Sequence, residues 1–392
     1  MTSRFPALFN RRRYNTLQLP CAATGSALLL GPALGQTHMA SEASTRTIDA
    51  DYLTGVLRGS GVLGDGRVTE VVVSSSRATV LSRIERLKIG YDSPAPDAPT
   101  SLILKTGLPE RLGNEAWDSG RQETAFYTDV APHMPERIVP VCYDGAWNPA
   151  TRAWHLLLED LTDSHVIATA WPLPPTFEQC QRVVRARARL GAIWWDHSSL
   201  GVSVGSWLDA STMERNLQRF AEALATFSDR EGDRLPRARR DLFERLIANG
   251  PRLNQRVLSR RNMTIVQGDA HFWNCFLPSD GGGDVRLFDW DCWRVDVATD
   301  DLAYMIAMHW YPDRRAAMER PLLNCFHAAL IDNGLRGYDR QALDEDYRLS
   351  ALWQATTPIW QANGNIPPVI WWNNLERIFL AIDDLGCRQF LS

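Results

Sequence analysis

The chain has 392 residues, of which 45% are hydrophobic and 22% are charged, and this is the composition of an ordinary globular protein. A formal net charge of −4 gives no overall attraction to nucleic acid or to an anionic membrane, and no run reaches the ~18–20 apolar residues of a membrane span. Seven scattered cysteines without a C-x-x-C pair predict reduced thiols in a cytoplasmic protein.

The first segment, residues 1–45, is left out of the predicted fold as a leader. Residues 1–41 contain no Asp or Glu, and their apolar patch GSALLLGPALG is interrupted by Gly and Pro. An acid-free composition suits an organellar transit peptide, so targeting by residues 1–38 stays open. We favour the simpler interpretation, in which translation begins at Met39.

Residues 46–160 are predicted to form a small β-rich lobe. We interpret residues 51–105 as strands, because RVTEVVVS, LKIGY and SLILKTG are β-branched or alternate between apolar and polar residues. A helical pattern follows from Asn114 to Val130 and ends before Pro132. Two further strand-like runs, RIVPVCYDGAW and RAWHLLLEDL, complete the lobe.

Residues 161–392 are predicted to form a larger helical lobe. Thr176 and Gln179 have the spacing of a capping box, and RRDLFERLIANG predicts a helix that ends at Gly250. Two short strands, MTIVQ and VRLFDW, are expected to pair as a hairpin with PSDGGGD as the turn. The fold class is therefore α+β, with two lobes and a cleft between them.

The hairpin carries the residues on which the functional prediction depends. Asp269 and Asn274 lie five apart in VQGDAHFWNC, and Asp289 directly follows an apolar run. Phosphoryl transfer uses one Asp to orient or deprotonate the attacking hydroxyl, and an Asn and a second Asp to hold Mg²⁺. We therefore predict Asp269 as the catalytic residue and Asn274 and Asp289 as metal ligands.

The nucleotide site is predicted in the β-rich lobe. Lys105 ends an apolar strand, where it could pair with phosphates, and Glu123 lies beside the apolar stripe of the following helix. Glu115 is the rival partner for Lys105, although it lies near the start of that helix. Gly59, Gly61 and Gly64 match G-x-G-x-x-G and are predicted as a flap over the phosphates, with an ordinary turn as the alternative.

LLLEDL, which includes Glu159 and Leu161, is interpreted as the hinge between the lobes, where backbone groups would contact adenine.

The chain resembles the aminoglycoside phosphotransferase and choline kinase superfamily. The resemblance rests on QGDAHFWN, LFDWD and DDLAYMI, and RQETAFYTDVAP and RLGAIWWDHSSL are similar to the ecdysteroid-kinase-like branch and its bacterial relatives. It implies a protein-kinase-like fold and an ATP- and Mg²⁺-dependent kinase. It also implies Asp269 as the base, Asn274 and Asp289 as Mg²⁺ ligands, and Lys105 with Glu123 as the phosphate-side ion pair.

Three further residues are placed by the same resemblance. His271 matches a His of the related motif G-D-x-H-x-x-N, and Asp301 is implied to hold the catalytic loop. Gln267 is a departure, because the family usually has His there, and an amide can partly fill that packing role.

The acceptor is predicted to be a small apolar or aromatic alcohol. The chain has fifteen Trp, and Trp194, Trp195, Trp371 and Trp372 are the candidates for the walls of its pocket. His197 and His309 are interpreted as packing or surface residues and not as ligands. An aminoglycoside- or choline-type kinase of the same fold and a nucleotide-binding pseudokinase remain as alternatives.

Overall fold

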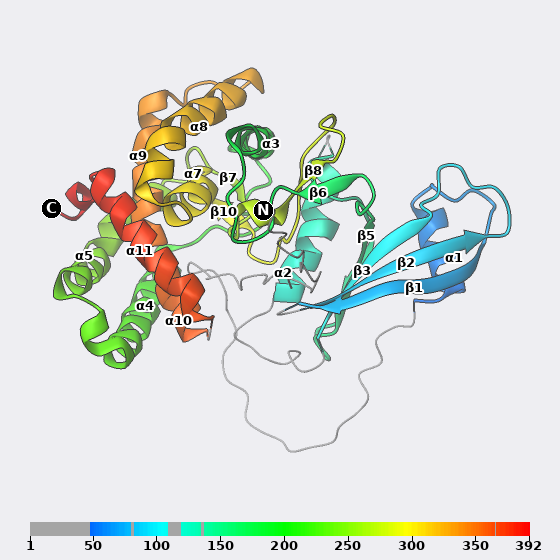
Figure 1. Ribbon diagram of the computed structural model, residues 1–392, viewed down its shortest axis with the longest axis horizontal. Coiled ribbons are helices and arrows are strands. Elements are labelled where there is room, and N and C mark those ends of the chain that lie inside the picture. Colours follow the sequence, from blue (N-terminus) through cyan, green and yellow to red (C-terminus); the bar gives the residue numbers. More distant parts are fainter. Residues whose placement is uncertain (1–47, 80–81, 109–118, 135–136, 365) are drawn as a thin grey trace, which may run out of the picture.

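The computed structural model describes residues 48–79, 82–108, 119–134, 137–364 and 366–392, and the fold has two lobes of different construction. The first contains an antiparallel sheet, and the second is built from helices (Figure 1). The predicted leader and Glu115 lie outside the described residues. Within the described part of the chain, no helix is long and apolar enough to cross a membrane.

The sheet of the first lobe has five strands in the order β1-β2-β3-β5-β4. Their bounds are Val68–Ala78 for β1, Ser82–Tyr91 for β2, Ser101–Gly107 for β3, Cys142–Trp147 for β4 and Trp154–Glu159 for β5. Successive side chains of a strand face opposite sides of a sheet. Leu157 accordingly joins a core cluster with helix α1, whereas Leu156 and Leu158 face the other way, into the main core.

Helix α1, Ala50–Gly59, corrects the prediction that the chain is all strand from residue 51 to residue 105. The side chain of Asp49 caps the helix by accepting a hydrogen bond from the backbone N–H of Tyr52. Leu53 and Leu57 are fully buried against the sheet, and their spacing of four is that of one helix face. The β-branched residues that predict strands begin only at β1, after this helix.

The other face of the sheet receives the helical run α2, Ser119–Ala125, which continues as a π-helical turn η2, Phe126–Val130, and a 3₁₀ turn η3, Ala131–His133. Phe126, Tyr127 and Val130 are buried in the main core, as their predicted apolar stripe requires. The helix therefore packs between the sheet and the second lobe.

The second lobe contains the remaining helices (Figure 1). The longer ones are α3 Phe177–Trp194, α4 Ala210–Glu231, α5 Arg237–Leu253, α8 Pro312–Asp332, α9 Arg340–Gln354, α10 Thr357–Asn363 and α11 Pro368–Asp384. The shorter ones are η4 Gly232–Arg234, α6 Gln255–Leu258, η5 Phe272–Asn274, α7 Thr299–Leu302, η6 Ala303–Met308 and η7 Cys387–Leu391. The predicted capping box of Thr176 and Gln179 is present at the start of α3.

Helix α5 runs past Gly250, where the sequence predicts its end. A Cβ atom at Gly250 would lie 2.5 Å from the side chain of Leu217 on α4. This glycine therefore allows α4 and α5 to approach closely, and it does not end the helix.

The short strands of the second lobe pair differently from the predicted hairpin. Strand β7, Thr264–Val266, pairs with β10, Arg294–Asp296. Strand β9, Arg286–Leu287, pairs with β8, Cys275–Pro278, which also pairs with β6, His165–Ile167. The glycine-rich turn thus joins β8 to β9, and the hairpin of MTIVQ with VRLFDW is wrong.

Candidate active site

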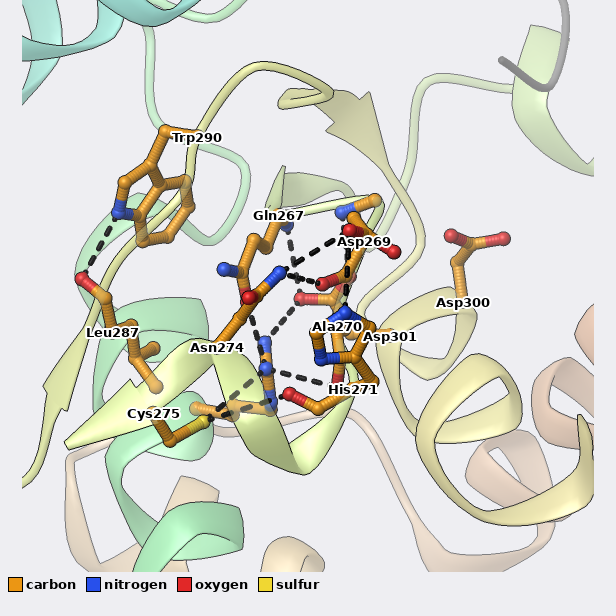
Figure 2. Close-up of polar contacts among 12 residues, drawn as sticks. Gln267, Asp269, Ala270, His271, Asn274, Cys275, Leu287, Trp290, Asp300 and Asp301 are labelled. Atoms are coloured by element: carbon orange, nitrogen blue, oxygen red, sulfur yellow. Dashed lines mark hydrogen bonds and ion pairs between the residues drawn. The ribbon is translucent and has the colours of Figure 1, made fainter. Parts of the chain in front are cut away.

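The segment after β7 carries Asp269 and Asn274 into the interior. Gly268 has a φ of +83°, and a Cβ atom there would lie 2.4 Å from the carbonyl oxygen of Cys292, so the turn requires glycine. Asp269 is 1% exposed, and the 3₁₀ turn η5 brings Asn274 back to it (Figure 2). The Asn274 side-chain N–H donates to the backbone carbonyl of Asp269 at 2.9 Å and to its carboxylate at 3.2 Å.

Asp269 has two further neighbours. The hydroxyl of Tyr304 donates to its Oδ1 atom at 2.5 Å, and Nε2 of His271 lies 3.5 Å from its Oδ2 atom. Burial raises the pKa of Asp269, while His271 and the bond from Tyr304 oppose that rise. Tyr304 is absent from the predicted site, because it comes from the π-helical turn η6, which no spacing in the sequence indicates.

Asp301 holds this loop in place, the structural role that was predicted for it. Its carboxylate accepts the backbone N–H of Gln267 at 3.0 Å and that of Gly268 at 2.9 Å. Asp301 is 4% exposed, so these bonds form away from water, where they are most effective.

Lys105 forms the predicted ion pair with Glu123. Leu102 and Leu104 face α1, so the alternation along β3 turns Lys105 toward α2, which carries Glu123. The Lys105 ammonium lies 2.7 Å from the Glu123 carboxylate and 2.7 Å from Oδ1 of Asp289. Burial alone would lower the pKa of Lys105, but the two carboxylates outweigh it and raise that pKa above its usual value.

Asp289 and Asp291 bring a concentration of negative charge to the same place. Asp289 is 8% exposed and adopts a left-handed backbone conformation with φ +68°. Burial, followed by the charges of Asp289 and Glu123, raises the pKa of Asp291 well above its usual value. Asp291 was not among the predicted ligands, although the spacing D-x-D in LFDWD is a signal that could have found it.

These residues fit a hard cation such as Mg²⁺. The side-chain oxygen of Asn274 is buried and has no hydrogen-bond partner among the described residues. Asn274, Asp289 and Asp291 offer oxygen atoms, and Mg²⁺ is commonly held by one or two carboxylates, with phosphates and water as its other ligands. The described residues contain no cluster of three or more His, Cys, Asp or Glu arranged for a metal.

Helix α2 is fastened to the segment that follows Asp289. Gln122 donates from its side chain to the carbonyl of Trp293 at 2.6 Å, and the indole N–H of Trp293 donates to the carbonyl of Gln122 at 2.7 Å. Phe126 stacks on the fully buried Trp290 with ring centroids 3.8 Å apart. The helix that carries Glu123 is thus held against the acidic segment by contacts on both sides of Glu123.

Gly59, Gly61 and Gly64 lie far from this site, which corrects the predicted phosphate flap. Gly59 is the last residue of α1, and the segment leads into the start of β1. Lys105 pairs with Ile84, which pairs with Arg77, nine residues after the start of β1. At about 3.3 Å per residue, the start of β1, to which the glycines lead, is therefore roughly 30 Å from Lys105 along the sheet.

The hairpin between β1 and β2, in contrast, lies at the end of the sheet that is nearer to Lys105. Ser82, at the start of β2, pairs with Gly107, two residues from Lys105. Thr79 and Ser82 close the hairpin through backbone and hydroxyl hydrogen bonds. The G-x-G-x-x-G spacing thus begins at the end of a helix, and the described residues at the end of the sheet nearer Lys105 include Thr79 and Ser82.

The predicted hinge follows β5. Glu159 is the last residue of β5, and its carboxylate accepts the backbone N–H of Val141 at 3.1 Å. The carbonyl of Leu161 accepts hydrogen bonds from the amides of Ser164 and His165, so it already has partners within the turn.

The four tryptophans predicted for the acceptor pocket pack inside the helical lobe. Trp194 is 2% exposed, and Trp195 packs against Tyr338 before α9. Trp371 contacts Phe227 of α4 and its neighbour Trp372.

A different tryptophan, Trp273, lies beside two histidines near Asp269. Trp273 is in the 3₁₀ turn η5, and its ring centroid is 5.5 Å from that of His271 and 6.0 Å from that of His309. His309 is buried, the first of its two predicted placements, and it lies beside Tyr304, with their ring centroids 5.0 Å apart. The approach of His309 to Tyr304 and to Trp273 depends on tertiary packing, which the sequence does not indicate.

Comparisons with known proteins agree with this geometry. The sequence model of the ecdysteroid kinase-like family matches residues 203–336. No curated protein sequence matches the chain.

Solved structures share the fold at low sequence identity. A protein described as an aminoglycoside phosphotransferase from Ralstonia eutropha is 12% identical, with a TM-score of 0.51 over 87% of this chain and 99% of that one. A choline/ethanolamine kinase family protein from Mesorhizobium loti is 13% identical, with a TM-score of 0.50 over 82% of this chain and 91% of that one. The chain thus has a two-lobed, protein-kinase-like fold and resembles the ecdysteroid kinase-like family of small-molecule kinases.

Proposed function

We propose that the protein is an ATP- and Mg²⁺-dependent kinase that transfers the γ-phosphoryl group to a hydroxyl of a small, apolar-faced alcohol. The observation that carries the proposal is the convergence of Asp269, Asn274 and Asp289 with the Lys105–Glu123 pair, from segments far apart in the sequence. Each of these residues has a role in phosphoryl transfer that its position supports.

Asp269 would act on the acceptor. Its buried carboxylate accepts the proton of the acceptor hydroxyl while a bond forms between that oxygen and the γ-phosphorus, and the bond from phosphorus to the bridging oxygen breaks to release ADP. Tyr304 and Asn274 hold the carboxylate in one orientation through the hydrogen bonds described above. Orientation of this kind lowers the barrier because the base needs no rearrangement when the acceptor arrives.

The remaining residues would bind the nucleotide. Asn274, Asp289 and Asp291 would hold Mg²⁺, which when bound neutralises charge on the transferring phosphates. Lys105 would pair with the phosphates, exchanging its present contact with Asp289 for a phosphate oxygen. The β1–β2 hairpin would cover the phosphates. The segment that includes Glu159 and Leu161 would contact adenine through backbone groups other than the Leu161 carbonyl, which accepts hydrogen bonds within the turn.

The surroundings of Asp269 favour a neutral acceptor. Nδ1 of His309 lies 2.7 Å from the carbonyl of Tyr304, which only accepts, so Nδ1 carries the proton. Burial, with the nearby Arg377, lowers the pKa of His309 well below its usual value, so the ring is neutral and its Nε2 atom is an acceptor. Nε2 of His309, Nδ1 of His271 and Nε1 of Trp273 are buried without partners among the described residues.

Arg377 donates to the backbone carbonyl of His309 at 3.0 Å, which places a positive charge in this region. The positive charge of Arg377 disfavours a cationic amino sugar or choline here, even though aromatic faces can bind a quaternary ammonium through cation–π contacts. Aromatic rings with unpaired nitrogens instead suit an acceptor that has an apolar body and additional hydrogen-bonding groups. The amino-sugar and choline alternative is therefore the second candidate.

ADP formation by the purified protein, measured across sterol, phenolic, amino-sugar and choline acceptors, tests the proposal. We expect turnover with neutral alcohols, and its loss in Asp269→Asn with ATP binding retained by calorimetry. Asp229→Asn, at an exposed residue of α4, is the matched control. Turnover of amino sugars or choline alone would select the second candidate, and ATP binding without turnover of any acceptor would indicate a pseudokinase.

A further inference from the structure

A buried arginine connects the catalytic loop to helix α3. Arg187 is 3% exposed, and its guanidinium donates to Oδ2 of Asp301 at 2.9 Å, to the side-chain oxygen of Gln267 at 2.7 Å and to the carbonyl of Ala270 at 3.1 Å. Asp301 in turn accepts the backbone amides of the same loop. Removing a charge from water costs free energy, and hydrogen bonds to buried partners offset that cost. Arg187 and the loop are therefore fixed relative to each other.

Gln267 is fully buried at the centre of this arrangement (Figure 2). Its side-chain N–H group donates to the carbonyl of Phe288 and, at 3.2 Å, to the carbonyl of Asp289. A guanidinium only donates and a carbonyl only accepts. The amide of Gln267 therefore has one orientation that satisfies both sides, with its oxygen toward Arg187 and its nitrogen toward residues 288 and 289.

The two carbonyls that Gln267 holds flank the Cα atom of Asp289. Asp289 has a φ of +68°, a conformation that an L-residue keeps only when its surroundings impose it. The conformation directs the carboxylate toward Lys105, which it contacts at 2.7 Å. A donor that fixes the peptide groups on both sides of this Cα atom therefore fixes where the carboxylate points.

We infer that Gln267 is a positioning residue that sets the backbone of Asp289, and that Arg187 acts through it by holding its amide in the working orientation. This inference rests on the proposed function, in which Asp289 is a metal ligand. It also gives a chemical reason why Gln can stand at this position. A neutral His could likewise donate one N–H to a carbonyl and present its other nitrogen to Arg187.

Three substitutions of Gln267 separate donation to the carbonyls from the contact with Arg187. Gln267→Glu keeps an oxygen for Arg187 but offers no donor to the carbonyls. Gln267→Met keeps the length of the side chain and removes both interactions, and it decides the matter if the buried charge of Gln267→Glu prevents folding. Gln267→His is the conservative rescue, and Gln218→Glu, at an exposed residue of α4, is the matched control.

Two measurements report on position without depending on turnover. Mn²⁺ binding in the presence of ADP is titrated through the loss of the free-ion EPR signal, and amide hydrogen exchange of residues 287–293 is followed in the protein alone. We expect Gln267→Glu and Gln267→Met to weaken Mn²⁺ binding by about tenfold or more, as for other residues that orient metal ligands. We also expect faster amide exchange in residues 287–293 of these two variants. For Gln267→His, we expect the Mn²⁺ affinity and the exchange rates to stay within about threefold of wild type.

Wild-type Mn²⁺ affinity and exchange in Gln267→Met would overturn the inference. So would an equal loss in Gln267→Met and Gln267→His, because that result would indicate packing alone. Failure of the wild-type protein to bind Mn²⁺ with ADP would instead overturn the proposed function. The exchange rates of residues 287–293 would then still decide whether Gln267 fixes the backbone of Asp289.

Discussion

Replacing Lys105 with Met removes a positive charge that contacts both Glu123 and Asp289. The Lys105 side chain is 9% exposed, the two carboxylates are 3% and 10% exposed, and both contacts are 2.7 Å long. Removing one member of a buried ion pair costs about 3–5 kcal/mol, because the remaining charge stays buried without compensation. Since Lys105 serves two carboxylates with Asp291 nearby, we expect a loss in unfolding free energy near the upper end, about 4–5 kcal/mol.

Replacing the acidic partner instead, in Glu123→Gln, should lower the unfolding free energy much less than Lys105→Met does. Lys105 keeps its contact with Asp289, the Gln oxygen can still accept a hydrogen bond, and the repulsion among the carboxylates decreases. We therefore expect a loss of about 1 kcal/mol in unfolding free energy, which is the net contribution of one hydrogen bond. The comparison separates loss of the cation from loss of one contact.

The pH dependence of the stability of Lys105→Met provides a further check, because the direction of the change can be predicted. Burial raises the pKa of Glu123 and of Asp291, and Lys105 opposes that rise, so Lys105→Met raises both pKa values further. Carboxyl groups with a higher pKa in the folded state bind more protons folded than unfolded, so their destabilising effect is complete above the folded pKa. Lys105→Met should recover stability as the pH falls through these raised values.

Urea unfolding followed by tryptophan fluorescence, at neutral and mildly acidic pH and with and without Mg²⁺, measures these differences. Lys88→Met, at the only other lysine of the sequence and exposed on β2, is the matched control. We expect Mg²⁺ to restore part of the stability of Lys105→Met, because it supplies positive charge to the same carboxylates. If Lys105→Met loses no more stability than Lys88→Met or Glu123→Gln, the buried charge balance described above is wrong.

Four other substitutions test the rest of the site. Asp269→Asn should lower kcat by about 10²–10⁴-fold while ATP affinity by calorimetry changes little, and an equal loss of both would indicate a structural role. Asp289→Ala should abolish turnover with the fold retained by circular dichroism, and near-normal turnover at ordinary Mg²⁺ would contradict its assignment. Tyr304→Phe removes a hydrogen bond that lowers the pKa of Asp269, so the acid limb of the pH–rate profile should move to higher pH, and an unmoved limb would count against the contact. Trp290→Ala should lower the unfolding free energy by about 3–5 kcal/mol in urea, because Trp290 is fully buried against Phe126, and a loss below 1 kcal/mol would rule out that packing.

The sequence was most informative where function depends on short segments. The spacing of Asp269 and Asn274, the apolar run before Asp289 and the capping box at Thr176 are all local patterns, and the structure contains each of them. Their convergence was expected from a hairpin that does not form. The pairing of β7 with β10 spans residues 264–296, and a pairing at that separation leaves no signature in either strand.

The errors have physical causes of the same kind. Gly59 and Gly61 match a phosphate-loop spacing, but Asp49 and the helical spacing of Leu53 and Leu57 were the stronger local signals for α1. Gly250 looked like a helix end because the presence of Leu217 against it is not visible in the sequence. Side chains that approach Asp269 from distant elements needed the tertiary structure.

The fastening of α2 has a consequence for how the activity would be controlled. Enzymes of this architecture can be idle when the helix carrying the acidic partner of the lysine swings outward. Here Gln122 is bonded twice to Trp293, and Phe126 is stacked on Trp290, so an outward swing would break two hydrogen bonds and expose a buried indole. We expect an enzyme that rests in its competent arrangement, whose output follows the supply of acceptor and the amount of protein without an activating modification.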